Sequence, residues 1–143
     1  MSIWYKKHTL AALNALATGT LMEALEIRFT EIGEDYLSAT MPVDRRTFQP
    51  AGLLHGGASV ALAESLGSMA SHLVVDPGKF RCVGIEVNAN HTRAAKSGVV
   101  TGTARPAHLG RSTHVWEIRI ADESGRTVCL SRLTMAILGT PEN

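Results

Sequence analysis

The chain has 143 residues, 45% of them hydrophobic, and carries 14 Lys and Arg against 13 Asp and Glu. That length predicts a single domain over residues 1–143, because two domains would each have too small a core. The near-neutral charge argues against nucleic acid as a partner. No stretch approaches the roughly 18 uninterrupted apolar residues of a membrane span, so we expect no membrane partner either.

The two cysteines, Cys82 and Cys129, lie far apart and show neither zinc-ligand nor CxxC spacing. We therefore expect no metal site and two free thiols, which are typical of a reducing cytosol. The N-terminal segment 1–8 has no apolar run like that of a secretory signal. Together these features predict a cytoplasmic location.

The first predicted elements are a helix and a hairpin. Thr9 precedes leucines at helical spacing, which predicts a short N-terminal helix over 9–16. Apolar residues alternate with polar ones over 24–32 and 37–41, which predicts a β-hairpin. The charged segment 43–49, which lies between two prolines, predicts a surface loop.

A long helix follows, from the segment 54–59 to about Leu73, and its lack of a polar face indicates that other structure surrounds it. After it we expect four strands, over 82–90, 99–105, 115–121 and 127–138, with a hairpin turn at 122–126. Trp116, Ile118 and Ile120 form one apolar strand face. The order of elements predicts an α+β fold in which an antiparallel sheet of about six strands curls around the central helix.

Glu64 stands in the middle of that apolar helix. Burying an unpaired carboxylate costs several kcal/mol, so such a group is normally paired, neutralised or used. Ser68 and Ser71 follow at about one and two turns, which predicts a polar stripe that includes Glu64. The helix alone leaves open whether Glu64 is a structural carboxylate bonded to serine hydroxyls or a catalytic one.

His55, Gly56 and Gly57 come immediately before this helix. Free N–H groups and the positive end of the helix dipole can stabilise an oxyanion there, and glycine lets a substrate approach the backbone closely. An isolated Gly-Gly pair more commonly only turns the chain into the helix. Its place beside a histidine and upstream of Glu64 favours a functional site.

The segment 49–59 (Gln-Pro-Ala-Gly-Leu-Leu-His-Gly-Gly-Ala-Ser), followed by Ala-Glu-Ser-Leu-Gly-Ser at 63–68, resembles the hotdog-fold thioesterases. Within them it is similar to the group that contains 1,4-dihydroxy-2-naphthoyl-CoA hydrolase of menaquinone synthesis and the proofreading thioesterase of enterobactin synthesis. Segments 83–91 and 106–111 extend the resemblance over nearly the whole chain. It implies a hotdog fold with one long central helix and a short N-terminal helix, and hydrolysis of an acyl-CoA thioester with an aromatic acyl group preferred.

The resemblance also implies roles at matching positions. Glu64 would attack the thioester carbonyl or activate a water that does so, while the Gly56 N–H would polarise the carbonyl oxygen. Gln49 and His55 would hold the acyl carbonyl or steer the leaving thiolate, and Ser68 would position the water or the carboxylate. No metal or cofactor is implied, since CoA is part of the substrate. A base or nucleophile and one oxyanion donor are sufficient for an activated thioester.

The residues implied in CoA binding are one strand position and two polar loops: Gly84; His91, Thr92, Arg93 and Ala94; His108, Leu109, Gly110, Arg111, Ser112 and Thr113. Arg93 and Arg111 can pair with phosphate oxygens, and Ser112 and Thr113 supply neutral donors. Residues alone do not distinguish these segments from ordinary solvated loops, so the assignment depends on the resemblance. The other histidines, His8, His72 and His114, receive no role.

An open sheet has unpaired edges that invite pairing. The resemblance implies homodimers with a continuous sheet that assemble into homotetramers. In each site, Gln49, His55 and Gly56 would come from one subunit, and Glu64 and Ser68 from its neighbour. The sequence leaves open whether CoA or an acyl-carrier protein bears the thioester. It also leaves open a hotdog hydratase or dehydratase and a non-catalytic acyl-CoA binding protein, although the full motif over 49–68 favours hydrolysis.

Overall fold

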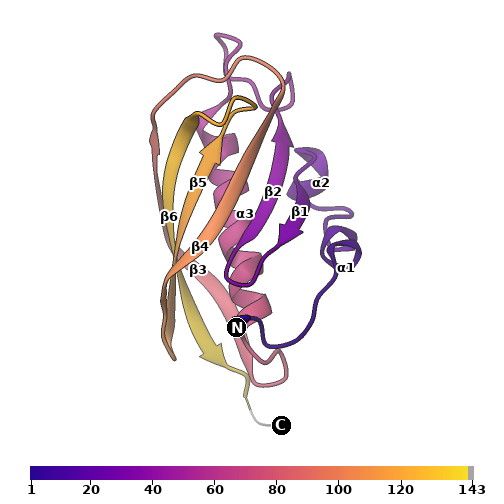
Figure 1. The fold of residues 1–143 in the computed structure, drawn as a ribbon, viewed down its shortest axis with the longest axis vertical. Coiled ribbons are helices and arrows are strands. Elements are labelled where there is room, and N and C mark those ends of the chain that lie inside the picture. The colour runs from indigo at the N-terminus through magenta and orange to yellow at the C-terminus, as the bar shows by residue number, and fades with distance from the viewer. Residues whose placement is uncertain (142–143) are drawn as a thin grey trace.

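The computed structural model describes residues 1–141. Six antiparallel strands form one sheet in the order β1-β2-β4-β5-β6-β3, and the sheet wraps around the long helix α3 (Figure 1). The elements are α1 (Leu10–Ala15), α2 (Leu21–Ala24), β1 (Arg28–Ile32), β2 (Leu37–Pro42), α3 (Gly56–Val74), β3 (Phe80–His91), β4 (Val99–Leu109), β5 (Thr113–Ala121) and β6 (Thr127–Gly139). No described helix is long and apolar enough to cross a membrane. The expected hotdog arrangement is confirmed.

The N-terminal region contains one helix more than the sequence predicts. α1 forms as expected, with the Thr9 side chain accepting the Ala12 N–H at 3.2 Å. The prediction of a strand over 24–32 is wrong at its start. α2 extends to Ala24, and β1 begins only at Arg28. Thr20 caps α2, and Glu26, with φ of 53°, ends the helical turn before β1 begins.

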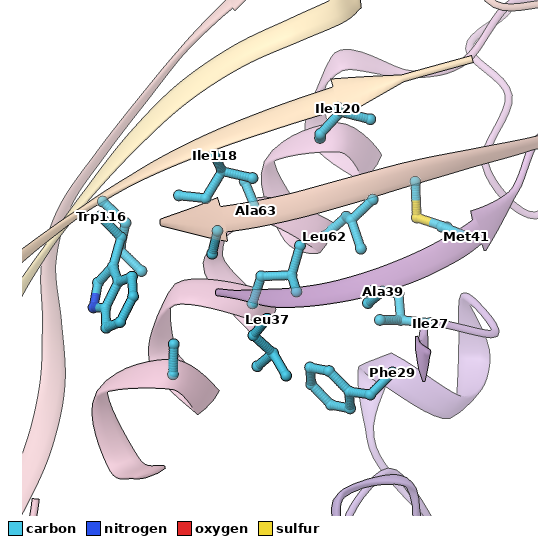
Figure 2. Close-up of a cluster of buried hydrophobic side chains, with 14 of the residues drawn as sticks. Ile27, Phe29, Leu37, Ala39, Met41, Leu62, Ala63, Trp116, Ile118 and Ile120 are labelled. Atoms are coloured by element: carbon cyan, nitrogen blue, oxygen red, sulfur yellow. The ribbon is translucent and has the colours of Figure 1, made fainter. Parts of the chain in front are cut away.

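The core lies between the inner face of the sheet and α3. Figure 2 shows side chains of β1, β2, β5 and α3 meeting there, among them Phe29, Leu37, Leu62 and Trp116. The predicted strand face of Trp116, Ile118 and Ile120 is confirmed, since all three side chains are fully buried. Fully burying a large apolar side chain contributes about 1.5–3 kcal/mol, so this cluster fixes α3 against the sheet.

One stripe of α3 is only partly covered in the single chain, which corrects the expectation that other structure surrounds the helix on every side. Val60, Glu64 and Ser68 are half-buried, and His72 is exposed. The cause is the sheet, which ends at β3, a strand that pairs only with β6. The stripe therefore lies along the open β3 edge of the fold.

Ser71 does not belong to that stripe, which corrects a second expectation. It is fully buried, and its Oγ accepts the Trp116 Nε1–H at 2.7 Å and lies 3.0 Å from His114 Nδ1. The Ser71 hydroxyl can therefore donate to His114, which must then carry its own proton on Nε2. Burial, and secondarily the charge of His108, lowers the pKa of the His114 imidazole below its usual value.

β4 is longer than predicted and continues past Pro106 to Leu109. β2 begins at Leu37, opposite Ala104, and does not reach Pro106, so β4 is an edge strand there and tolerates a residue without an N–H. Only 110–112 then remain as the turn into β5, closed by the Gly110 N–H donating to the Thr113 carbonyl at 2.9 Å. The turn predicted at 122–126 is confirmed.

Candidate active site

The loop before α3 is held by hydrogen bonds rather than by regular structure. The buried Thr47 donates its hydroxyl to the Pro42 carbonyl at 2.8 Å and accepts the His55 N–H on its own carbonyl at 2.7 Å. Leu54 donates its N–H to the Ala95 carbonyl at 2.8 Å. These bonds fix the chain direction where α3 begins and hold the loop against the segment that follows β3.

His55 is the N-cap of α3. Its Nδ1 accepts the Gly57 N–H at 2.8 Å, so the neutral ring carries its proton on Nε2. That tautomer leaves an N–H free to donate beside the helix N-terminus. The cap thus satisfies one of the free backbone donors of α3 and also sets the chemistry of the ring.

Gly56 and Gln49 each present free donors at this point. Within residues 1–141, no acceptor takes the Gly56 N–H, although it lies at the positive end of a 19-residue helix. Gln49 accepts the Ala51 N–H on Oε1, and its amide NH2 group donates to no acceptor among residues 1–141. Both groups can stabilise negative charge on a carbonyl oxygen.

A cavity of about 400 Å³ opens over the N-terminus of α3. Six of the predicted site residues line it: Gln49, Gly56, His91, Thr92, Arg93 and Ala94. His91 lies close to the start of the helix, because a Cβ atom on Gly56 would lie 2.7 Å from its Nε2. We call Gln49, Gly56 and His91 the donor cluster.

Glu64 and Ser68 lie farther along α3 and meet the β3 edge. A Cβ atom on Gly84 would lie 2.7 Å from Glu64 Oε1, so the carboxylate rests directly on the backbone of β3. Ser68 Oγ lies 3.6 Å from the sulfur of Met135, the residue paired with Gly84. We call Glu64, Ser68, Gly84 and Met135 the carboxylate cluster. Within residues 1–141, no hydrogen bond joins Glu64 to a serine hydroxyl, so the bonding that the structural interpretation requires is not present.

One chain does not bring the two clusters together. Gly56 and Glu64 are eight residues apart on α3, which corresponds to about 12 Å of helix. A reacting carbonyl needs its attacking group and its oxyanion donor each within about 3 Å. The cavity at Gly56 therefore lacks the carboxylate, and Glu64 lacks a donor cluster of its own.

The residues implied in CoA binding are likewise divided between two ends of the sheet. His91 pairs with Cys129, near the start of β6, whereas Thr113 pairs with Ala136, near its end. Residues 91–94 thus lie beside the donor cluster, at one end of the sheet. Residues 108–113 lie at the other end of the sheet, near Gly84. Neither arginine of these segments makes an ion pair among the described residues.

Four residues that line the cavity were not anticipated from the sequence: Leu53, Leu54, Ser59 and Val128. Ser59 carried a usable signal. It follows Gly56 by three residues, so both lie on one helix face, and helical side chains lean toward the N-terminus. Val128 carried none, because only the pairing of β3 with β6 brings it to the cavity.

Comparison with known proteins agrees with this geometry. The family model described as "Thioesterase superfamily" matches residues 51–129. The chain is similar to 1,4-dihydroxy-2-naphthoyl-CoA hydrolase of Escherichia coli (strain K12), with 57% identity over 95% of this chain and 99% of that protein. It is 56% identical to proofreading thioesterase EntH of Cronobacter turicensis, over 96% of this chain and 99% of that one.

Solved structures give the same result. A mutant thioesterase from Pseudomonas aeruginosa superposes with a TM-score of 0.96 at 53% identity, covering 97% of this chain and all of that one. A thioesterase from Haemophilus influenzae superposes with a TM-score of 0.95 at 46% identity, covering 99% and 98%. The names of these relatives and solved structures describe thioesterases and a hydrolase, which favours hydrolysis over dehydration or binding without turnover. The chain belongs to the thioesterase superfamily and is a hotdog-fold enzyme that hydrolyses thioesters.

Proposed function

We propose that the chain hydrolyses an aromatic acyl-CoA thioester to the free acid and CoA, with Glu64 as base or nucleophile and the Gly56 N–H as oxyanion donor. The proposal is supported chiefly by Gly56, whose N–H has no acceptor among residues 1–141 and which lines the cavity at the start of α3. Gln49 and His55 would contact the acyl carbonyl or the leaving thiolate. No metal and no cofactor beyond the CoA of the substrate takes part.

Glu64 can take part in the hydrolysis by either of two routes. As a base, it takes a proton from water while the water oxygen bonds to the carbonyl carbon, the C–S bond breaks, and the proton passes to the thiolate. As a nucleophile, it bonds to the carbonyl carbon and expels the thiolate, and water then cleaves the resulting anhydride. In either route the carbonyl oxygen gains charge, which the Gly56 N–H stabilises.

We further propose that two chains share each site. β3 is a 12-residue edge strand with Val83 42% and Ile85 61% exposed, which suits pairing with a second β3. An antiparallel pairing centred midway between 84 and 91, near Val87, puts Gly84 of one chain opposite His91 of the other. The same two-fold axis brings the carboxylate cluster of one subunit to the donor cluster of the next.

This pairing also unites the two segments implied in CoA binding. Because the partner's sheet runs in the opposite direction, its residues 108–113 lie at the same end as 91–94 of the first chain. Arg93 and the partner subunit's Arg111 would then both be available to the phosphates of CoA. Assembly of two such dimers into a homotetramer, and a cytoplasmic location, are parts of the same proposal.

The aromatic acyl group is proposed from the relative whose name states an aryl-CoA substrate. Leu53, Leu54 and Val128 give the cavity an apolar wall that suits a ring. Measured kcat/KM values for benzoyl, naphthoyl, phenylacetyl and octanoyl thioesters, each on CoA and on an acyl-carrier protein, test this choice. Higher values for octanoyl-CoA than for the aryl esters would contradict it.

Replacement of Glu64 tests the catalytic assignment. We expect E64A to lose hydrolysis, followed as released thiol, while its affinity for a CoA thioester stays within about tenfold, because the carboxylate acts mainly on the transition state. A single turnover in 18O-labelled water tests the nucleophilic route, since label enters Glu64 only if water attacks the glutamyl carbonyl of the anhydride. An E64A protein with wild-type turnover would remove Glu64 from the reaction.

A further inference from the structure

The side chain of His91 faces the N-terminus of α3. The Nε2 corner of its ring points at Gly56: a Cβ atom there would lie 2.7 Å from Nε2 but 3.1 and 3.2 Å from the two neighbouring ring carbons. Only the absence of a side chain at Gly56 permits this approach. The ring corner that bears the proton or the lone pair therefore adjoins the backbone unit that carries the free N–H.

Strand alternation explains this direction. Side chains on β3 alternate between the two faces of the sheet. Val87 and Ala89 pack against the core, whereas Asn88 and Asn90 line a groove on the outer face. His91 follows the parity of Val87 and Ala89, so it points to the α3 side.

His91 is also free to act on a ligand. Among residues 1–141, neither ring nitrogen takes part in a hydrogen bond or ion pair, and the side chain lines the same cavity as Gly56 and Gln49. Its neighbour Thr92 differs, because Thr92 donates its N–H to the Val128 carbonyl at 3.0 Å and its hydroxyl to the Thr127 carbonyl at 3.1 Å. The chain thus anchors Thr92 and leaves the adjacent imidazole unpaired beside an oxyanion donor.

We infer that His91 is a further catalytic residue of the proposed thioester hydrolysis, on which this inference rests: its Nε2–H donates to the thioester carbonyl oxygen beside the Gly56 N–H. Two donors on one oxygen match the two lone pairs of a developing oxyanion. A role at the nucleotide is a different assignment, because the pantetheine arm separates the thioester from the phosphates and one side chain cannot contact both.

The test compares a long and a truncated substrate that share one acyl group, benzoyl-CoA and S-benzoyl-N-acetylcysteamine. Loss of an oxyanion donor typically lowers kcat on the order of 10²–10³-fold. We expect H91A to lower kcat/KM by at least tenfold, and by the same factor on both substrates. H91Q, whose amide can donate from a position near that of Nε2, should recover part of the loss.

The matched control is N90A, which changes the preceding residue of the same strand on the opposite face and should keep wild-type turnover. Loss on benzoyl-CoA alone would assign His91 to the nucleotide and overturn the inference, as would a loss below threefold on both esters. If H91A does not fold, H91Q decides. An H91Q protein that loses turnover on neither ester then overturns the inference. A wild-type enzyme that cleaves neither ester would instead overturn the proposed function.

Discussion

The carboxylate of Glu64 lies directly on the backbone of Gly84, where a β-carbon would come within 2.7 Å of Oε1. This contact joins the middle of α3 to the edge strand of the sheet. It gives the glycine a role that differs from the one implied by resemblance, since Gly84 makes room for the acid itself. The nucleotide assignment of this position stays a prediction.

Replacing Gly84 with alanine should therefore displace the carboxylate without unfolding the protein. The atom in the way is the far end of a flexible side chain, so Glu64 can move aside at little cost to stability. We expect G84A to lower kcat at least tenfold, because small displacements of a catalytic group are costly. Its thermal unfolding midpoint should stay within a few degrees of wild type.

The control is G139A, since nothing lies within 4 Å of a β-carbon at Gly139. That variant should keep both turnover and unfolding temperature. Full activity in G84A would show that the position of the carboxylate does not depend on Gly84.

His55 combines a structural and a chemical role, and two substitutions separate them. H55A removes the cap on the Gly57 N–H and should cost about 1 kcal/mol of stability, together with activity. H55N restores a capping acceptor but has no Nε2–H, so it should recover stability and not turnover. Urea unfolding and steady-state kinetics on the three proteins check this, and recovery of turnover in H55N would limit His55 to capping.

The exposed edge strand predicts the assembly state. Lysine on an edge strand discourages pairing, so I85K should shift the protein toward monomers and reduce turnover in parallel. L16K is the control, because Leu16 has the same 61% exposure as Ile85 but lies after α1, far from β3. Light scattering during size-exclusion chromatography gives the masses, and an active I85K monomer would contradict a shared site.

The buried His114 predicts a loss of stability in mild acid. Its folded-state pKa is lowered, first by burial and then by His108, so the unfolded chain binds the proton more tightly. The contribution is fully present above the ordinary histidine pKa of about 6.5 and is lost as the pH falls toward the folded value. The free energy of unfolding should therefore decrease between pH 7 and pH 5.

H114N isolates this contribution. Asparagine can still accept the Ser71 hydroxyl but does not titrate, so the decrease between pH 7 and pH 5 should be smaller than in wild type. Urea unfolding at the two pH values measures the difference. An unchanged pH dependence would assign the acid sensitivity to other groups, with His8 the first candidate because burial lowers its pKa as well.

The sequence predicts the local features well and the relations between distant residues poorly. Thr9, the apolar periodicity of α3 and the alternation in β5 each indicate one element, because caps and burial act over a few residues. The sequence does not indicate α2, since a four-residue helix has too few positions to show a period. The sequence does not predict the direction of the Ser71 side chain, because that direction depends on Trp116 and His114, two residues that only the sheet brings beside it.

The candidate site divides in the same way. Gln49, His55 and Gly56 lie within eight residues of one another in the chain, and the structure keeps them together at the start of α3. The approach of His91 to Gly56 and of Glu64 to Gly84 depends on how β3 lies against the helix. No periodicity within either segment encodes that register, so the structure is needed to pair these residues.

Each chain keeps its carboxylate about 12 Å of helix away from its own donor cluster. If sites form only across the two-fold axis, a mixed dimer of E64A and Q49A chains contains one site with both defects and one with neither. Random exchange between the two inactive variants makes about half of the dimers mixed, so about a quarter of all sites are restored. Such complementation cannot arise in an enzyme whose subunits each hold a complete set of catalytic groups.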